Sequence, residues 1–336
     1  MSDLAVVLIS RNQEWNIARL IESVLSETLS IPATEIVLVD SASTDRTIDI
    51  AGHYPINILR LRPDQRLTPA AGRYVGYKNT TGELVLFLDG DMELFPGWLE
   101  KALRFCRNNL DVAVVTGQIV DLPKTAGADD KPPMANMDVD TFSEVRQGGG
   151  AALYKRLVLD EIGPFNPYLH SEEEPELCVR IRHAGYRVIR FQYPIAYHYS
   201  DPQGALSTLV GRWRRNLYLG AGQVIRYHLG SKTFWLYFKE RGYGCAPILG
   251  LTVGLVSFLA SVRSRQWIWF SLWLLALAGI IVRDVFRKRS LYRTAFSLLM
   301  RTFVIDGTVR GFLLKPLDPD NYPGRLDEIK PASHPD

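Results

Sequence analysis

The chain has 336 residues, of which 47% are hydrophobic and 22% are charged, a composition that fits one large or two modest folded domains. Lysine and arginine exceed aspartate and glutamate by only 39 to 36, so the charge does not indicate a nucleic-acid partner, and we expect none. The three cysteines are widely spaced and odd in number, which favours free thiols in a reducing compartment. No basic leader precedes the first apolar run, so we expect no signal peptide.

Residues 1–120 alternate apolar runs with helical patterns. A first strand is predicted at 4–9, and the apolar residues after it recur at helical spacing. A second strand at 35–40 ends in the polar residues 41–45, which favour turns and helix N-caps and can face an anion or a ribose. This alternation predicts a mostly parallel, doubly wound α/β sheet.

The most informative motif ends the next apolar run, where Asp89, Gly90 and Asp91 follow residues 84–88. The run predicts a strand buried on both faces, and an open α/β sheet places its ligand at the carboxyl end of such strands. Two aspartates there repel each other unless a cation or a basic partner joins them. A magnesium ion takes one or two carboxylates plus substrate oxygens. The same three residues also suit an ordinary acidic turn.

A run of carboxylates opens a predicted helix near residue 174. Ser171 and Glu174 have the spacing of a capping box, in which Glu174 would be structural. Pro175 favours the first helical position instead, which would make Glu174 the N-cap and stabilise it as an anion available for base catalysis. Glu176 and Arg180 lie one helical turn apart and are predicted to form a supporting ion pair.

Two segments of membrane length follow. Residues 242–262 and 266–282 contain no charged residue, and a span needs about 17 or more apolar residues. We expect a transmembrane hairpin, the alternative being two buried core helices of unusual length. The basic cluster at 283–289 is stronger than the link at 263–265, so the positive-inside rule predicts a multi-pass protein of the cell membrane with its N-terminal domain in the cytoplasm.

These patterns divide the chain into three predicted parts: a globular α/β domain at 1–230, the hairpin with its basic flanks at 231–290, and a C-terminal part at 291–336. Residues 291–314 mix arginines with apolar residues, which suits either an amphipathic helix at the membrane interface or a helix packed on the globular domain. From residue 316 onward the chain is rich in proline, aspartate and lysine, and we expect a loosely ordered tail.

Four stretches together resemble the family 2 glycosyltransferases, which are inverting enzymes with the nucleotide-diphospho-sugar transferase fold called GT-A. In the family's order, the stretches are residues 7–14, 35–47, 70–91 and 148–186. The resemblance implies the GT-A fold, a doubly wound mixed α/β sheet, followed here by transmembrane helices. It also implies a nucleotide-sugar donor and a divalent metal ion, Mg or Mn, as the cofactor.

The resemblance implies a role for each matching residue. The nucleotide site would be lined by Ser10, Arg11, Asp40, Arg73 and Asp89. Asp40 would lie near the base, and Asp89 near the ribose and diphosphate. Asp91 would hold the metal together with Asp89. His198 matches a position that often supplies another metal or phosphate contact, although a lone histidine at a strand end is more often structural.

An inverting transfer needs a base that takes the proton of the acceptor hydroxyl during attack. In the family this base is the second acid of a Glu-Asp-x-Glu-Leu motif, which corresponds here to Glu174, with Glu173 as the alternative. Gly149 lies in the stretch that resembles the acceptor loop. The chain departs from the family's usual pattern in three places: Asp-Ser-Ala-Ser at 40–43 for Asp-Asp-Gly-Ser, Asn-Gln-Glu at 12–14 for Asn-Glu, and Tyr74 where many relatives carry asparagine.

The segment after the globular domain bears on the acceptor. Processive synthases of the family carry Gln-x-x-Arg-Trp there, and here Arg212 and Trp213 are present while Leu209 occupies the glutamine position. Two spans are also too few to enclose a polymer channel, so the sequence favours single transfer. Arginines beside the membrane suit an anionic lipid head group such as polyprenyl phosphate, or simple attraction to the membrane surface.

The sequence therefore predicts a membrane-anchored, inverting glycosyltransferase of cell-envelope glycan biosynthesis that acts at the cytoplasmic face. Its acceptor would be lipid-linked or membrane-proximal, and family frequency favours a UDP-linked donor. The alternatives are a processive polysaccharide synthase subunit and a catalytically silent, sugar-nucleotide-binding partner of another membrane enzyme. The presence of Asp89, Asp91 and a carboxylate at position 174 counts against a catalytically silent protein. No residue identifies the sugar.

Overall fold

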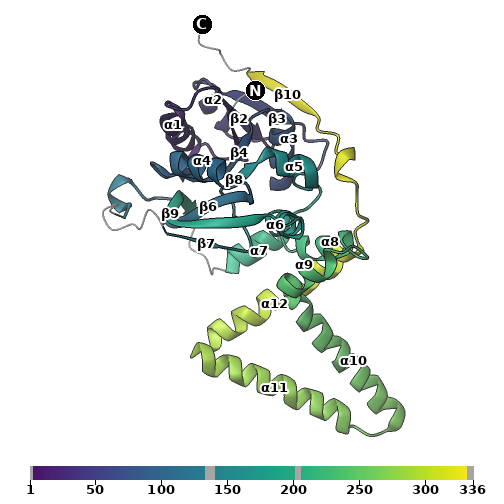
Figure 1. Cartoon of the computed structure of the whole chain (residues 1–336). Helices are drawn as coiled ribbons and strands as arrows, with labels where there is room; N and C mark the ends of the chain where they lie inside the picture. Colours follow the sequence, from purple (N-terminus) through teal and green to yellow (C-terminus); the bar gives the residue numbers. More distant parts are fainter. Residues whose placement is uncertain (1–2, 133–140, 201–205, 331–336) are drawn as a thin grey trace. The chain divides into compact units, whose positions relative to one another are not determined.

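The structure, a computed structural model, describes residues 3–132, 141–200 and 206–330. The chain forms two compact units (Figure 1). The α/β unit comprises Met1–Gln203 together with Leu317–Asp336, and the helical unit comprises Gly204–Pro316.

A 10-stranded mixed sheet runs through the described part of the α/β unit. Its strands are β1 (Leu4–Ser10), β2 (Thr34–Asp40), β3 (Asn57–Leu61), β4 (Leu84–Asp89), β5 (Met92–Leu94), β6 (Val112–Pro123), β7 (Phe142–Glu144), β8 (Ala152–Lys155), β9 (Arg187–Ser200) and β10 (Leu326–Lys330). Strands β3, β2, β1 and β4 are parallel neighbours in that order, whereas β8 pairs antiparallel with both β4 and β6. The predicted doubly wound mixed sheet is confirmed.

Helices cover both faces of this sheet. They are α1 (Ile17–Thr28), α2 (Thr47–Ala51), α3 (Pro69–Lys78), α4 (Trp98–Asn108), α5 (Arg156–Ile162) and α6 (Glu173–His183). Every residue of β1 is buried. Leu4, Val6 and Leu8 pack into one core with α1 and α4, while Ala5, Val7 and Ile9 pack into a second core with α3, α5 and α6. A strand that is apolar at every position is what two covered faces require.

Helix α3 sits unusually close to β1. A β-carbon at Gly76 would overlap the side chain of Val7, and one at Gly72 would lie 3.0 Å from Ile9 Cγ2. The helix begins where Thr68 accepts a hydrogen bond of 3.0 Å from the Ala71 N–H, with proline at the next position. This close seating leaves the next residue after Gly72, Arg73, little freedom of position.

The C-terminal tail contains a strand where we expected a loosely ordered chain. Leu326–Lys330 forms β10, which pairs antiparallel with β3 at the edge of the sheet. The strand lacks the apolar alternation by which a strand is recognised in a sequence. It forms because β3 offers an edge of unpaired backbone groups, which favours the addition of another strand.

The helical unit consists of helices in its described part: α7 (Leu206–Arg214), α8 (Gly220–Tyr227), α9 (Phe234–Arg241), α10 (Ala246–Ser264), α11 (Ile268–Lys288) and α12 (Leu291–Leu313). Helices α10 and α11 are long and apolar enough to cross a membrane. Only 11% of the apolar window of α10, and none of that of α11, is buried. Core helices of a soluble protein are mostly buried, whereas α10 and α11 are mostly exposed. The two helices therefore do not fit the alternative of buried core helices.

Helix α12 packs closely on α8 within this unit. A β-carbon at Gly222 would overlap the backbone of Thr308, and one at Gly311 would overlap the backbone of Leu219. The sequence predicts a first domain that ends at residue 230, whereas in the structure α7 and α8 belong to the helical unit. The glycine contacts with α12 account for the place of α8.

Candidate active site

Three parallel strands bring polar residues to one edge of the sheet. Ser10 at the end of β1 stands beside Asp40 at the end of β2, and Ile9 of β1 stands beside Asp89 at the end of β4. The carboxyl ends of β1, β2 and β4 therefore lie side by side at one edge of the sheet, and they bring together residues from separate sequence motifs.

Asp40 is fully buried, and the turn that follows β2 holds its carboxylate. Its carboxylate accepts hydrogen bonds from the Ser43 N–H (2.8 Å), the Ser43 hydroxyl and the Ser10 hydroxyl (3.4 Å). Within the turn, Ala42 has φ of 55°, a left-handed conformation that glycine adopts more easily. Alanine therefore occupies, with some strain, the place where many relatives have glycine. Arg11, beside this turn, is exposed.

Arg73 lies at the centre of a cluster of acids. It is only 2% exposed, and it contacts Asp89 (Nη2–Oδ1, 2.6 Å), Glu173 (Nη1–Oε1, 2.9 Å) and Glu174 (Nη2–Oε1, 3.1 Å). One guanidinium thus serves three carboxylates, and the cluster carries excess negative charge when all three are ionised. Burial raises the pKa of Asp89 to about 6, with Arg73 opposing the rise. Gly150 allows this packing, because a β-carbon there would lie 2.8 Å from Asp89 Oδ2.

The start of α6 differs from the arrangement predicted for Glu174. The N-cap is Glu172, with φ of 64°, and Glu174 is the second helical residue, so the prediction of Glu174 as N-cap was wrong. Pro175 is accommodated because the first turn of a helix contains N–H groups without intrahelical partners.

The carboxyl group of Glu174 is also harder to ionise than we expected. Burial raises the pKa of Glu174 well above its usual range, while the neighbouring guanidinium of Arg73 opposes that rise. A carboxylate with a raised pKa accepts a proton more readily at neutral pH, which suits a general base.

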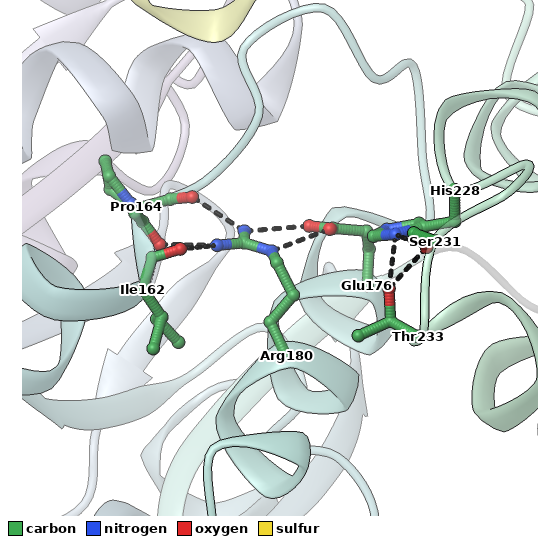
Figure 2. Close-up of polar contacts among 8 residues, drawn as sticks. Ile162, Pro164, Glu176, Arg180, His228, Ser231 and Thr233 are labelled. Atoms are coloured by element: carbon green, nitrogen blue, oxygen red, sulfur yellow. Dashed lines mark hydrogen bonds and ion pairs between the residues drawn. The ribbon is translucent and has the colours of Figure 1, made fainter.

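The predicted ion pair behind this helix start is confirmed. Arg180 forms two bonds with the buried Glu176, at 2.7 Å from Nε and 2.9 Å from Nη2. Arg180 Nη1 also donates to the carbonyl oxygens of Ile162 (2.8 Å) and Gly163 (2.6 Å), and Nη2 donates to that of Pro164 (2.8 Å). Figure 2 shows the contacts with Ile162 and Pro164. These bonds tie α6 to the end of α5 and so fix the helix that carries Glu173 and Glu174.

Asp91 and His198 face each other across β5 and β9. Asp91 Oδ2 lies 3.6 Å from His198 Nε2, and His198 Nδ1 lies 2.7 Å from Asp121 Oδ1. The two carboxylates raise the pKa of His198 to about 9. Asp91 Oδ1 is buried and has no hydrogen-bond partner. An orphaned carboxylate oxygen next to an imidazole fits a cation site, although the described residues contain no group of three or more such ligands.

Two residues of this region were not singled out from the sequence. Asn16 is buried, and its amide donates to the carbonyl oxygens of Gly90 (3.0 Å) and Met92 (2.9 Å), which holds the turn that carries Asp91. Its sequence signal, an asparagine before an apolar helical pattern, is that of a helix cap. Asp121 gives no local signal, because it meets His198 only through the pairing of β6 with β9.

The predicted acceptor residues lie in two different units. Gly149, in the α/β unit, has φ of 88°, which favours glycine. Arg212 and Trp213 lie in the helical unit, where the Trp213 Nε1–H donates to Asp306 Oδ2 (2.8 Å) and the ring stacks on Phe303. Arg212 is exposed.

The profile of the family "Glycosyl transferase family 2" matches residues 5–168, the stretch that holds Asp40, Arg73, Asp89 and Asp91. The chain therefore carries a family 2 glycosyltransferase domain. It is 25% identical over 228 residues to glycosyltransferase AglE of Haloferax volcanii, covering 66% of this chain and 73% of AglE. It is 30% identical over 224 residues to the pre-mycofactocin glycosyltransferase of Mycobacterium tuberculosis, covering 62% of this chain but only 45% of that relative.

Solved structures of other glycosyltransferases share the fold. The mannosyltransferase PcManGT of Pyrobaculum calidifontis, in complex with GDP-Man and Mn2+, aligns with a TM-score of 0.57 at 18% identity, covering 93% of this chain and 87% of that one. TarS 1-349 of S. aureus, in complex with UDP-GlcNAc, aligns with a TM-score of 0.51 at 18% identity, covering 100% and 98%. The glycosyltransferase described here therefore has the GT-A fold.

Proposed function

We propose that this glycosyltransferase moves a sugar, with inversion, from a nucleotide-sugar donor to a lipid-linked or membrane-proximal acceptor at the cytoplasmic face of the cell membrane. We further propose that a divalent metal assists the reaction and that Glu174 is the base. PcManGT binds GDP-Man and TarS binds UDP-GlcNAc, so both donor classes have precedent among similar folds. We favour a UDP-sugar.

The observation that carries this proposal is the shared contact of Arg73. Its guanidinium touches Asp89, at the strand end proposed for the donor, and Glu173 and Glu174, at the helix start proposed for the base. The donor and base residues therefore meet in one cluster. In the reaction, Glu174 takes the proton of the attacking group, a hydroxyl or a phosphate P–OH, while the acceptor oxygen bonds to the anomeric carbon and the bond to the diphosphate breaks. Glu173 is the alternative base.

The proposed metal ligands are Asp91 and His198, with Asp89 nearby. The unpartnered Oδ1 of Asp91 supports this assignment. A bound divalent ion would offset the charge of the departing nucleoside diphosphate. Because the described residues offer fewer than three such ligands together, we expect donor oxygens to complete the coordination. His198 must lose its proton before it can bind a metal.

The proposed location at the membrane rests on features of the helical unit. Helices α10 and α11 expose apolar side chains along lengths that suit a bilayer. The basic residues at 283–289 support a cytoplasmic catalytic unit. We propose Gly149, Arg212 and Trp213 as acceptor contacts, with Arg212 suited to a lipid phosphate such as that of a polyprenyl phosphate.

Nucleoside diphosphate release from a panel of UDP- and GDP-sugars tests this proposal. The assay uses the full chain in membranes, with and without manganese or magnesium and with and without polyprenyl phosphate. We expect release that needs both metal and lipid and that is lost in Glu174→Gln. Donor binding without release under any condition would contradict the proposed enzyme and favour the silent partner. Product length separates single transfer from processive synthesis.

A further inference from the structure

The end of the chain returns to the α/β unit after the helical unit. We call residues 317–330 the C-terminal strap. Its strand β10 pairs with β3 in register, with Leu326 opposite Leu61 and Asp327 opposite Arg60. Two ion pairs flank this pairing, Arg62 with Asp327 and Arg325 with Asp64, both at 2.7 Å. These pairs are about half exposed and contribute little, so the buried part of the strap decides how firmly it binds.

The buried part of the strap is Tyr322, which is 7% exposed. Its ring packs edge-on against Tyr74, with centroids 5.9 Å apart, and against Tyr168, with centroids 5.5 Å apart. Its hydroxyl donates to the carbonyl oxygen of Arg66 at 2.7 Å. In return, the Tyr168 hydroxyl donates to the carbonyl oxygen of Asn321 at 3.0 Å. Tyr322 is therefore held by both ring packing and hydrogen bonds.

Both aromatic partners of Tyr322 belong to segments that also carry members of the acid cluster or lead into them. Tyr74 is buried in α3 directly after Arg73. Tyr168 lies in the loop that leads into α6, where Glu173 and Glu174 stand. Tyr74 is also the position at which the chain departs from the asparagine of many relatives, and an aromatic ring there offers the strap a packing surface that an amide does not.

The segment before α3 and the loop before α6 are joined directly beneath the strap. The Thr68 hydroxyl, which caps α3, donates to the carbonyl oxygen of Pro167 at 2.8 Å. Arg66 Nη1 donates to the carbonyl oxygen of Tyr168 at 3.3 Å. Tyr322 covers this junction and bonds to Arg66 itself. A change at Tyr322 therefore acts on the two elements whose separation sets the contacts of Arg73 with Glu173 and Glu174.

We propose that Tyr322 is a positioning residue for the transfer reaction: through Tyr74 and Tyr168, the C-terminal strap holds the arginine of α3 and the base of α6 at their working separation. This inference rests on the proposed function of Glu174 and Arg73. It extends the machinery of the enzyme to a segment far outside residues 5–168, the part matched by the family profile.

The competing explanation is that the strap only protects the edge of β3, as an added strand does. Ile329 separates the two explanations, because it lies in β10, is 45% exposed and is not among the residues that contact Tyr322 at the junction. Ile329→Ala thus truncates a side chain of β10 without removing the aromatic contact, and it is the matched control for Tyr322→Ala.

The test uses the full chain in membranes and compares Tyr322→Ala, Tyr322→Phe and Ile329→Ala. We expect Tyr322→Ala to lower kcat roughly tenfold while the donor KM changes less than about twofold, because geometry at the base changes and the Asp40 turn does not. Tyr322→Phe keeps the ring and should recover most of kcat, and Ile329→Ala should match the wild type. In parallel, hydrogen–deuterium exchange of residues 166–174 should become faster in Tyr322→Ala alone. If Tyr322→Ala does not fold, Tyr322→Leu replaces it, with the same expectations.

Three results would overturn the inference: an unchanged kcat in folded Tyr322→Ala, an equal loss in Ile329→Ala, or a loss of kcat without faster exchange at 166–174. A wild-type protein that is inactive with every donor would instead overturn the proposed function. Exchange would then still test the strap, because faster exchange in Tyr322→Ala supports the packing link without reference to activity, and unchanged exchange removes it.

Discussion

The two units of this glycosyltransferase use apolar residues in opposite ways. In the α/β unit, every residue of β1 is buried, and the charged Arg73 is buried with them among paired carboxylates. In the helical unit, α11 has no buried residue although it is among the most apolar segments of the chain. Hydrophobicity alone therefore does not indicate a core. The length of an uncharged run distinguishes a strand enclosed by protein from a helix suited to lipid.

The largest expected effect tests whether the buried charges of the α/β unit perform chemistry. Glu174→Gln removes the proposed base and keeps the size of the side chain, so transfer should fall about a thousandfold with donor binding retained. Steady-state release of the nucleoside diphosphate and donor titration measure the two quantities. Glu173→Gln is the matched variant, and a greater loss there would move the base to Glu173.

The next effect tests whether the α/β unit depends on the buried guanidinium that Asp89, Glu173 and Glu174 share. Arg73→Met leaves three carboxylates without their buried partner, which should destabilise the unit by about 3–5 kcal/mol. Thermal or denaturant unfolding of the protein in detergent measures the change. Arg62→Met, which breaks a half-exposed ion pair, is the control and should cost less than about 1 kcal/mol. Equal stability of the two variants would show that the cluster around Arg73 is not structurally important.

A third prediction concerns the helical unit. Leu275 lies within α11 and is 69% exposed, and Leu275→Arg places a charge inside the proposed span. Insertion should become less favourable by about 2.5–3.5 kcal/mol, so a larger fraction of the protein should be released from membranes by alkaline carbonate. Phe286→Arg, near the basic end of the same helix, should have a much smaller effect. If both variants stay soluble and active without membranes, the anchor is contradicted.

The smallest effect sharpens the description of the proposed metal site. Asp121 contacts His198 Nδ1 and would orient the imidazole toward the ion. Asp121→Asn should therefore weaken manganese-dependent activation about tenfold, with a rise in the manganese concentration needed for half-maximal rate and little change in the rate at saturation. Asp129→Asn, an acidic residue outside this cluster, is the control. An unchanged manganese requirement would remove Asp121 from the site.

Local patterns were sufficient for several features of this protein. The apolar run before Asp89 predicts a buried strand that ends at the ligand edge, and the spacing of Glu176 and Arg180 predicts their ion pair. The uncharged runs around α10 and α11 predict two long apolar helices in the same way. Each of these depends on residues close together in the sequence, whose geometry the helix or strand period sets.

Other features required the packing of distant segments. Asn16 resembles a helix cap in the sequence, yet its amide holds Gly90 and Met92 because α1 packs against β5. The strand β10 lacks a strand pattern and exists because β3 presents an open edge.

The cluster around Arg73 shows most clearly which features the sequence determines and which depend on tertiary structure. The family resemblance implies that Asp89, Arg73 and an acid near position 174 belong to one site, but it does not indicate which side chains touch. A guanidinium with several donors can satisfy any nearby carboxylate, so its partners are set by distance. The close seating of α3 on β1 and the anchoring of α6 by Arg180 establish those distances, and both arise only when the chain has folded.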